Sequence, residues 1–418
     1  MEYAFFHPTQ ADKEALDYHA RTPHGKTATT LTKPLVSPHD FTLAYSPGVA
    51  APCRMIAHDP ATANRYTNRG NLVAVLTNGS ALLGLGNLGA LPSKPVMEGK
   101  CMLLKKLADV DSFDIELDES DPDRLVELIR ALSTGFGAIL LEDIKAPDCF
   151  YIERRLKALL SIPVLHDDQH GTAVVVAAAV INAAKVAGKA IDSLHTVVIG
   201  AGAAAIASAK ILLRLGIRAD RLVMVDSLGV ITRERPLLPD YKQHFATTRR
   251  ISTLKEALVD ADLVVGVSKG NLMDEEMVRT MAMRPIVLAL SNPDPELSPE
   301  VAQRARPDLI YATGRSDLKN QANNALAMPY LFRAALDCEA RAFNDEMLLA
   351  AAHALAALAR EEIATEGATL GAEMLLPKID DQRLRERIVP AVIEAAIKSG
   401  EARVKRKEER GKRKEERG

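Results

Sequence analysis

The stretch TVVIGAGAAAIASAKILLRLG, from Thr196 to Gly216, predicts the fold of this chain more directly than any other. A β-branched run, a glycine turn and a small-residue helix follow one another, as in units that bind dinucleotides. Gly200 permits the tight turn, and Gly202 lets the backbone approach a pyrophosphate at the helix N-terminus, where free N–H groups favour an anion. Ala205 takes the third small position, which allows close packing of helix on strand.

The next apolar run, RLVMVD, ends in Asp226, where an acidic side chain would bind the adenosine ribose. The alternative is a glycine-rich packing turn followed by a surface aspartate. The neighbouring sequence favours nucleotide binding, because five short apolar runs are separated by helical segments: TVVIGAG, RLVMVDS, DLVVGVS, PIVLALSN and DLIYATG. This alternation predicts an α/β fold with a doubly wound, Rossmann-type sheet.

The residues before this unit also alternate between strand-like runs (LVAVLT, GAILLEDI, IPVLHDD) and helical segments, which predicts a second parallel α/β layer. The Asn-Gly-Ser at 78–80 is typical of a hairpin turn. A helix is expected over 172–186, and Ala/Leu-rich helices are expected from 321 to 359 and from 380 to 398. The predicted organisation is a substrate and metal domain (1–171), a nucleotide domain (172–325), C-terminal helices (326–402) and a charged tail (403–418).

The composition excludes several classes of protein. A net charge of −2 over 418 residues gives no overall basic field for nucleic acid. Four scattered cysteines predict neither a disulfide framework nor a zinc site. No secretory signal and no uncharged apolar run of about 20 residues is visible, so a cytoplasmic location is expected. The final KRKEERG repeat predicts a solvated tail, with a nucleic-acid arm as the alternative.

Acidic pairs follow two of the predicted strands: Glu142 and Asp143 end one, and Asp167 and Asp168 end another. The carboxyl ends of parallel strands meet at one edge of a sheet, so these four side chains are expected to lie together. Such an oxygen-rich group suits Mg²⁺ or Mn²⁺. Each acid alone would more simply be a helix cap or a surface ion pair. His166 and His170 could also ligate, but supporting a ligand or capping a helix is the favoured role.

At this point the sequence resembles the malic enzymes, specifically the short bacterial kind, over nearly all of its length apart from the tail. The resemblance rests on motifs in the expected order: TLAYSPGVA, LGLGNLGALPSKPVMEGK, LEDI, HDDQHGTA, the GAGAAA turn, SNPDPE and ATGRSDLKNQANNALAMPY. It implies a substrate and metal domain, a nucleotide domain and C-terminal helices that pack back on the first. It also implies oxidative decarboxylation of L-malate to pyruvate and CO₂, with reduction of NAD(P)⁺.

The resemblance implies a role for each matching position. Tyr45 would be the general acid and Lys100 the general base, with Asp167 supporting the lysine. Glu142, Asp143 and Asp168 would ligate the metal. Asn292 and Asn324 would contact malate, and Asn292 the nicotinamide as well. From the residues alone, the favoured interpretation is that Tyr45 is a loop-packing aromatic and Lys100 a solvated helix lysine.

One departure from the family concerns the substrate carboxylate. Animal-type members carry an arginine where this chain has Ala81, and an aspartate where it has Asn87. Short bacterial members share this pattern, and Ser80, backbone N–H groups and the two asparagines are candidates for holding the C4 carboxylate. The phosphotransacetylase-like domain of many relatives is absent from this sequence.

The sequence leaves open which nicotinamide cofactor is used and which reaction is catalysed. Asp226 disfavours a 2′-phosphate, whereas Arg233 and Arg235 could offset it, so NADP is preferred weakly over NAD. A homodimer is expected from the family. The alternative functions are a malolactic enzyme, an oxaloacetate decarboxylase on the same fold, and a non-catalytic nucleotide-binding protein.

Overall fold

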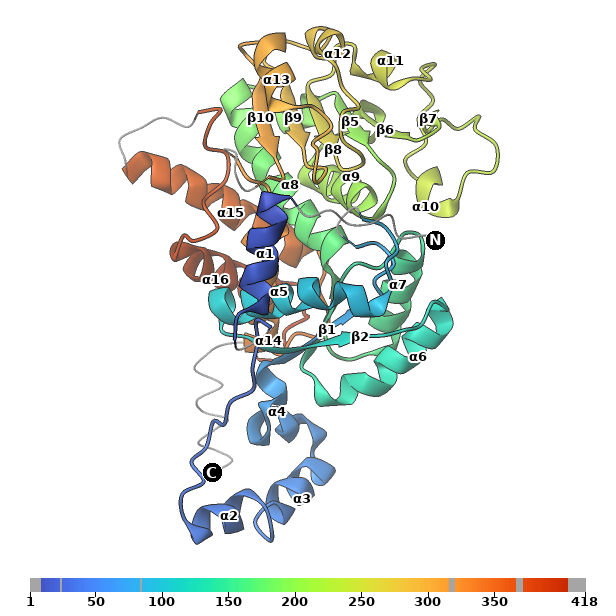
Figure 1. Ribbon diagram of the computed structural model, residues 1–418. Helices are drawn as coiled ribbons and strands as arrows, with labels where there is room; N and C mark the ends of the chain where they lie inside the picture. The colour runs from blue at the N-terminus through green and yellow to red at the C-terminus, as the bar shows by residue number, and fades with distance from the viewer. Residues whose placement is uncertain (1–8, 23–24, 83–84, 316–319, 366–370, 405–418) are drawn as a thin grey trace.

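The computed structural model describes residues 9–22, 25–82, 85–315, 320–365 and 371–404. They form two sheets of mostly parallel strands, and a long helix, α8 (Asp167–Ala187), leads from the first sheet to the second (Figure 1). The predicted α/β class with a doubly wound sheet is confirmed. The predicted tail from Lys405 onward lies outside the described residues, and the predicted domain boundaries stay predictions.

The first sheet has the order β2-β1-β3-β4, and every pairing in it is parallel. The central strand β1 is buried throughout because LVAVLT is apolar and helices cover both faces of a parallel sheet. The sequence did not predict the edge strand β2, whose residues DSFDIE are mostly polar and none of them fully buried. Strands and helices of this part are β1 (Leu72–Thr77), α5 (Ala90–Ala108), β2 (Asp111–Glu116), α6 (Pro122–Leu132), β3 (Ala138–Leu141), α7 (Asp148–Leu159) and β4 (Val164–His166).

The predicted hairpin at Asn78–Ser80 is wrong. The neighbours of β1 are β2 and β3, both parallel to it, and residues after the turn do not pair with β1. Gly79 has a φ of +64°, and the Asn78 side chain accepts from the Ser80 N–H at 3.3 Å. The chain instead turns at the end of β1 toward the end of β3, where the Ala81 N–H donates to the Asp143 carbonyl at 3.0 Å.

The second sheet has the order β10-β9-β8-β5-β6-β7, and only the short β7 is antiparallel. All five predicted runs are strands. The order reverses between β5 and β8, which places a ligand crevice at their carboxyl ends. Strands and helices of this part are β5 (Thr196–Ile199), α9 (Ala203–Leu215), β6 (Leu222–Asp226), β7 (Gly229–Val230), α10 (Asp240–Gln243), α11 (Leu254–Leu258), β8 (Leu263–Gly266), α12 (Glu275–Arg279), β9 (Ile286–Ala289), α13 (Pro299–Ala305) and β10 (Ile310–Thr313).

Helix α8 begins at Asp167, earlier than the predicted start at Thr172. Two aspartates in its first turn suit the positive end of the helix dipole. Its Ala/Val run packs against α9 and α15 (Asp345–Thr365) within the main hydrophobic core. Among the described residues α8 alone is long and apolar enough to cross a membrane, but it is mostly buried, as expected of a core helix.

The C-terminal helices α14 (Met328–Asp337), α15 and α16 (Arg383–Lys398) pack together, and α14 also contacts α5 and β3 of the first sheet. The predicted helical C-terminus is therefore present. At the other end, α1 (Gln10–Ala20), α2 (Pro38–Ala44) and α3 (Ala50–His58) contain no buried residue. Figure 1 shows α2 and α3 projecting away from both sheets at the bottom of the view, joined to the body through α4 (Ala63–Tyr66).

Candidate active site

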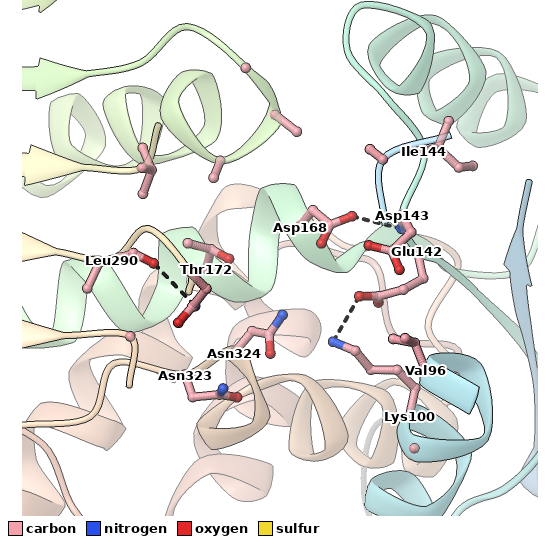
Figure 2. Close-up of a pocket in the computed structure, with 18 of the residues that line it drawn as sticks. Val96, Lys100, Glu142, Asp143, Ile144, Asp168, Thr172, Leu290, Asn323 and Asn324 are labelled. Atoms are coloured by element: carbon pink, nitrogen blue, oxygen red, sulfur yellow. Dashed lines mark hydrogen bonds and ion pairs between the residues drawn. The ribbon is translucent and has the colours of Figure 1, made fainter. Parts of the chain in front are cut away.

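A single cleft of about 1080 Å³ lies between the carboxyl ends of the two sheets. Helix α5 and the end of β3 form one wall, with Lys100, Glu142 and Asp143. The glycine turn and the ends of β8 and β9 form the other, with Gly202 and Asn292. Figure 2 shows the acidic side chains and Lys100 facing the strand ends of the nucleotide part across this space.

Three carboxylates meet in the cleft. Glu142 and Asp143 follow β3, and Asp168 is the second residue of α8. One oxygen from each lies within 4.8 Å of the other two (Figure 2). Asp143 has a φ of +51°, a conformation that aspartate tolerates better than most residues, and its N–H donates to Asp168 Oδ2 at 2.9 Å. The backbone turn at the end of β3 therefore brings the acids together.

The electrostatics of this cluster favour a cation. Burial raises the pKa of Glu142 well above its ordinary value, and the charges of Asp168, Asp167 and Asp143 add to that effect against the opposing charge of Lys100. Mg²⁺ and Mn²⁺ prefer sites in which all the ligands are oxygens, and Glu142 Oε2 is a buried oxygen with no hydrogen-bond partner to compete with an ion. The residues therefore fit a divalent ion.

Neither predicted histidine joins the three carboxylates. His166 is fully buried, with Nε2 3.4 Å from Asp168 Oδ2, and burial lowers its pKa. His170 Nε2 instead lies 2.8 Å from the buried carboxylate of Glu153. His170 therefore pairs with Glu153, and a supporting role for His166 stays a prediction.

The fourth predicted acid, Asp167, binds Lys100 instead of joining the three. Lys100 Nζ lies 2.5 Å from Asp167 Oδ2 and 3.0 Å from Glu142 Oε1. Burial disfavours the ammonium group, but the charges of Asp167, Glu142 and Asp168 outweigh that effect and raise the pKa of Lys100 above its ordinary value. Lys100 therefore contacts the group of three carboxylates through Glu142.

Gly171 explains how Asp167 reaches this position. A Cβ at Gly171 would lie 1.8 Å from Asp167 Oδ1 and 3.0 Å from Asn324 Cβ. Any larger residue would therefore push both side chains out of place. The sequence predicted only a helix that starts just after Gly171, and this packing role was missed because Asn324 is distant in the chain.

The predicted nucleotide turn has the expected geometry. Gly200 has a φ of +123°, and a Cβ built on it would lie 3.4 Å from Ala205 Cβ, so strand and helix pack closely there. Gly202 precedes α9 with no side-chain cap, and a Cβ on it would meet nothing within 4 Å. The first N–H groups of α9 therefore face open space in the cleft, as a pyrophosphate requires.

Asp226 ends β6, and two cations bind it. Arg235 Nη2 lies 2.6 Å from Oδ1 and Lys242 Nζ lies 2.8 Å from Oδ2. Burial raises the pKa of Asp226, but these hydrogen bonds outweigh burial and lower it. The sequence predicted that Arg233 and Arg235 could offset the charge of Asp226. Among the described residues Arg235 and Lys242 pair with Asp226 and Arg233 does not, and Lys242 was missed because α10 returns to β6 only in the folded chain.

The two predicted asparagines line the cleft. Asn292 Nδ2 donates weakly to the Leu290 carbonyl at 3.4 Å, and Asn324 points toward the carboxylates in Figure 2. Its neighbour Asn323 is occupied as a cap, because its Oδ1 accepts from the Ala325 N–H at 2.9 Å. Asn323 therefore uses its amide oxygen for the cap, whereas the side chain of Asn324 is directed toward the carboxylates.

Two other predicted residues are placed differently. Tyr45 ends α2 in the projecting arm, is 76% exposed and does not line the cleft of its own chain. Ser80 is used structurally, because its hydroxyl donates to Asn78 Oδ1 at 2.6 Å and accepts from the Lys145 N–H at 3.0 Å. Ala81 lines the cleft but brings no charge.

The geometry agrees with known proteins. The family model for the malic enzyme N-terminal domain matches residues 24–157, and that for the malic enzyme NAD-binding domain matches residues 169–397. An NADP-dependent malic enzyme of Halomonas elongata is 49% identical over 403 residues, which cover 94% of this chain and 96% of that protein.

Two further relatives extend the comparison. An NAD-dependent malic enzyme of Rhizobium meliloti is also 49% identical, over 94% of this chain, but the match spans only 52% of that longer protein. The crystal structure of a malic enzyme from Pyrococcus horikoshii superposes with a TM-score of 0.90 at 39% identity, covering 96% of this chain and 94% of that one.

Proposed function

Because the chain belongs to the malic enzyme family, we propose that it oxidatively decarboxylates L-malate to pyruvate and CO₂ with reduction of NAD(P)⁺. The observation that carries this proposal is the meeting of three carboxylates and a buried lysine in the cleft that also holds the dinucleotide turn. The reaction needs a metal site, a proton-transfer group and a hydride acceptor within reach of one small substrate. The carboxylates, the lysine and the dinucleotide turn meet that requirement in one cleft.

The carboxylates of Glu142, Asp143 and Asp168 are the proposed metal ligands. A divalent ion held there would act as a Lewis acid toward the oxygens of the substrate. His166 and the Asp143 N–H would orient Asp168 through Oδ2, leaving its other oxygen for the ion. The amides of Asn292 and Asn324 would bind carboxylate or nicotinamide groups without adding charge.

Lys100 is the proposed group that takes the C2 hydroxyl proton as hydride leaves C2. Asp167 would hold its ammonium in place and shuttle no proton itself. The charges of the surrounding carboxylates raise the pKa of this lysine. Lys100 could accept a proton only when the positive charge of a metal ion offsets the negative charge of these carboxylates. Proton transfer would therefore depend on a filled metal site.

Tyr45 is the proposed acid that protonates C3 of enolpyruvate, and its exposed position favours action in a second copy of the chain. Apolar side chains are exposed along the same arm, among them Phe41, Leu43, Val49 and Met55. Contiguous exposed apolar groups mark interaction surfaces. We therefore propose a homodimer in which the arm of one copy, residues 38–58, covers the cleft of the other.

NADP is the proposed cofactor, because Arg235 and Lys242 together outweigh the charge of Asp226 at the ribose end of β6. Replacing Lys242 with glutamine should lower kcat/KM for NADP⁺ about 10-fold, since charge-assisted hydrogen bonds to phosphate contribute roughly 1.5–3 kcal/mol. The value for NAD⁺ should change little. Steady-state rates with both cofactors test this, with Lys255→Gln on exposed α11 as the control. An equal loss for both cofactors would contradict it.

The experiment that tests the whole proposal supplies L-malate, Mn²⁺ and NADP⁺ and measures reduced nicotinamide and pyruvate together. Equal amounts of both are expected. A malolactic enzyme would form lactate and leave no reduced cofactor, an oxaloacetate decarboxylase would act only on oxaloacetate, and a non-catalytic protein would form neither product. A cytoplasmic location is proposed on the free, mostly buried cysteines.

A further inference from the structure

Glu296 is a buried acid for which the proposed chemistry has no use. It follows β9 in SNPDPE, and its exposure is 0%. Its two oxygens bind the ends of two different strands. Oε1 accepts from the Ser268 N–H at 2.7 Å, just beyond β8, and Oε2 accepts from the Ser291 N–H at 3.1 Å, just beyond β9.

The surroundings of Glu296 fit a carboxylate that carries its charge. Within the described part of the chain its hydrogen-bond partners are N–H donors, and an ionised carboxylate only accepts, whereas a protonated one would turn an O–H toward a donor. Burial raises the pKa of Glu296 above its ordinary value, and the backbone N–H groups around it offset only part of that rise. Among the described residues no lysine, arginine or histidine forms an ion pair with it.

Gly266 makes room for this carboxylate. A Cβ on Gly266, the last residue of β8, would lie 2.5 Å from Glu296 Cδ. The acid therefore fits directly against the backbone of the strand end. Both amides that it binds belong to residues that line the cleft, on the wall that faces Lys100 across it. Figure 2 shows this wall at Leu290, opposite Lys100.

We propose that Glu296 supplies a buried negative charge behind the cleft wall at Ser268 and Ser291 and so favours the oxidised, cationic nicotinamide ring over the reduced, neutral one. This rests on the proposed function insofar as NAD(P) binds in this cleft. The charge of Glu296 would attract an oxidised, cationic ring bound in the cleft and would have little effect on a reduced, neutral one. Glu296 would therefore strengthen binding of the oxidised cofactor relative to the reduced one.

Equilibrium binding separates this role from a merely structural one. The dissociation constants of NADP⁺ and NADPH are measured by calorimetry on the whole chain, for the wild type and Glu296→Gln. The glutamine should weaken NADP⁺ binding relative to NADPH about 5-fold, because an ion-to-ion attraction through a partly buried medium is lost. If the substitution only disturbed the strand ends, the dissociation constants of NADP⁺ and NADPH would rise by the same factor. Partial unfolding also cancels in the ratio of the two constants.

Two further variants control the comparison. Glu296→Asp keeps the charge but shortens the reach to Ser268 and Ser291, so both affinities should fall while their ratio stays that of the wild type. Glu300→Gln removes a charge from exposed α13, and neither constant should change. Should the glutamine variant not fold, Glu296→Ala offers a second neutral side chain and leaves space for water to serve the two amides.

The outcomes are distinct. An unchanged ratio in both neutral variants, or an equal shift in Glu296→Asp and Glu296→Gln, would overturn the electrostatic role of Glu296. A wild type that binds neither nucleotide would overturn the proposed function itself. A shift confined to the neutral variants supports the inference.

Discussion

Replacing Lys100 with methionine is expected to lower kcat for malate oxidation by about 10²–10⁴-fold, the range contributed by a positioned proton-transfer group. Methionine fills a similar volume on α5 but can neither carry a proton nor bind Asp167. The loss should appear in kcat and kcat/KM for malate. Lys106→Met, on the exposed side of the same helix, should leave both unchanged.

A metal titration separates this catalytic loss from damage to the carboxylates. Lys100 places a positive charge 3.0 Å from Glu142, so its removal should strengthen Mn²⁺ binding or leave it unchanged. A loss of Mn²⁺ affinity in parallel with kcat would show that the lysine only holds the cluster together. A fall in kcat of less than about 10-fold would exclude it as the proton-transfer group.

Tyr45→Phe should lower kcat by a similar factor of about 10²–10⁴, although Tyr45 lies outside the cleft of its own chain. The phenyl ring keeps the packing of the arm and loses only the hydroxyl. The variant should retain the wild-type dissociation constants for NADP⁺ and Mn²⁺. A near-normal kcat would contradict the assignment.

Mixing the two inactive variants shows which chain supplies the tyrosine. Tyr45→Phe and Lys100→Met chains are unfolded, combined in equal amounts and refolded. If the arm acts on a second copy, each mixed dimer has one site with both residues intact, and about a quarter of wild-type activity should return. If each chain uses its own Tyr45, every site keeps one defect and activity stays at the level of either variant refolded alone.

Local sequence predicted most of what positions the site. Strand, turn and helix from Thr196 to Gly216 follow from β-branched residues, glycines and small residues that each favour the observed backbone. Glu142, Asp143 and Asp168 were predicted as neighbours because parallel strands end at one edge of a sheet. That rule needs only the strand boundaries, not the packing.

Contacts between distant segments could not be predicted in this way. Lys242 reaches Asp226 only because α10 folds back on β6, and Gly171 is needed only because Asp167 and Asn324 meet beside it. The Asn-Gly-Ser turn has the same local preference in a hairpin as in the loop observed. The loop forms because β1 pairs in parallel with β2 and β3, so no hairpin partner can lie beside it. The projecting arm was not predicted either, since its exposed apolar groups are visible only in the fold.

The most direct test of the account is the binding of Mn²⁺ to the purified chain, followed by electron paramagnetic resonance, in the wild type and Asp168→Asn. The account predicts one tight Mn²⁺ per chain and a loss of affinity of at least about 100-fold in the variant, because a charged oxygen ligand is removed. Glu127→Gln, which neutralises an exposed acid on α6, should bind like the wild type. Equal stoichiometry and affinity in the wild type and Asp168→Asn would contradict the claim that Glu142, Asp143 and Asp168 share one cation.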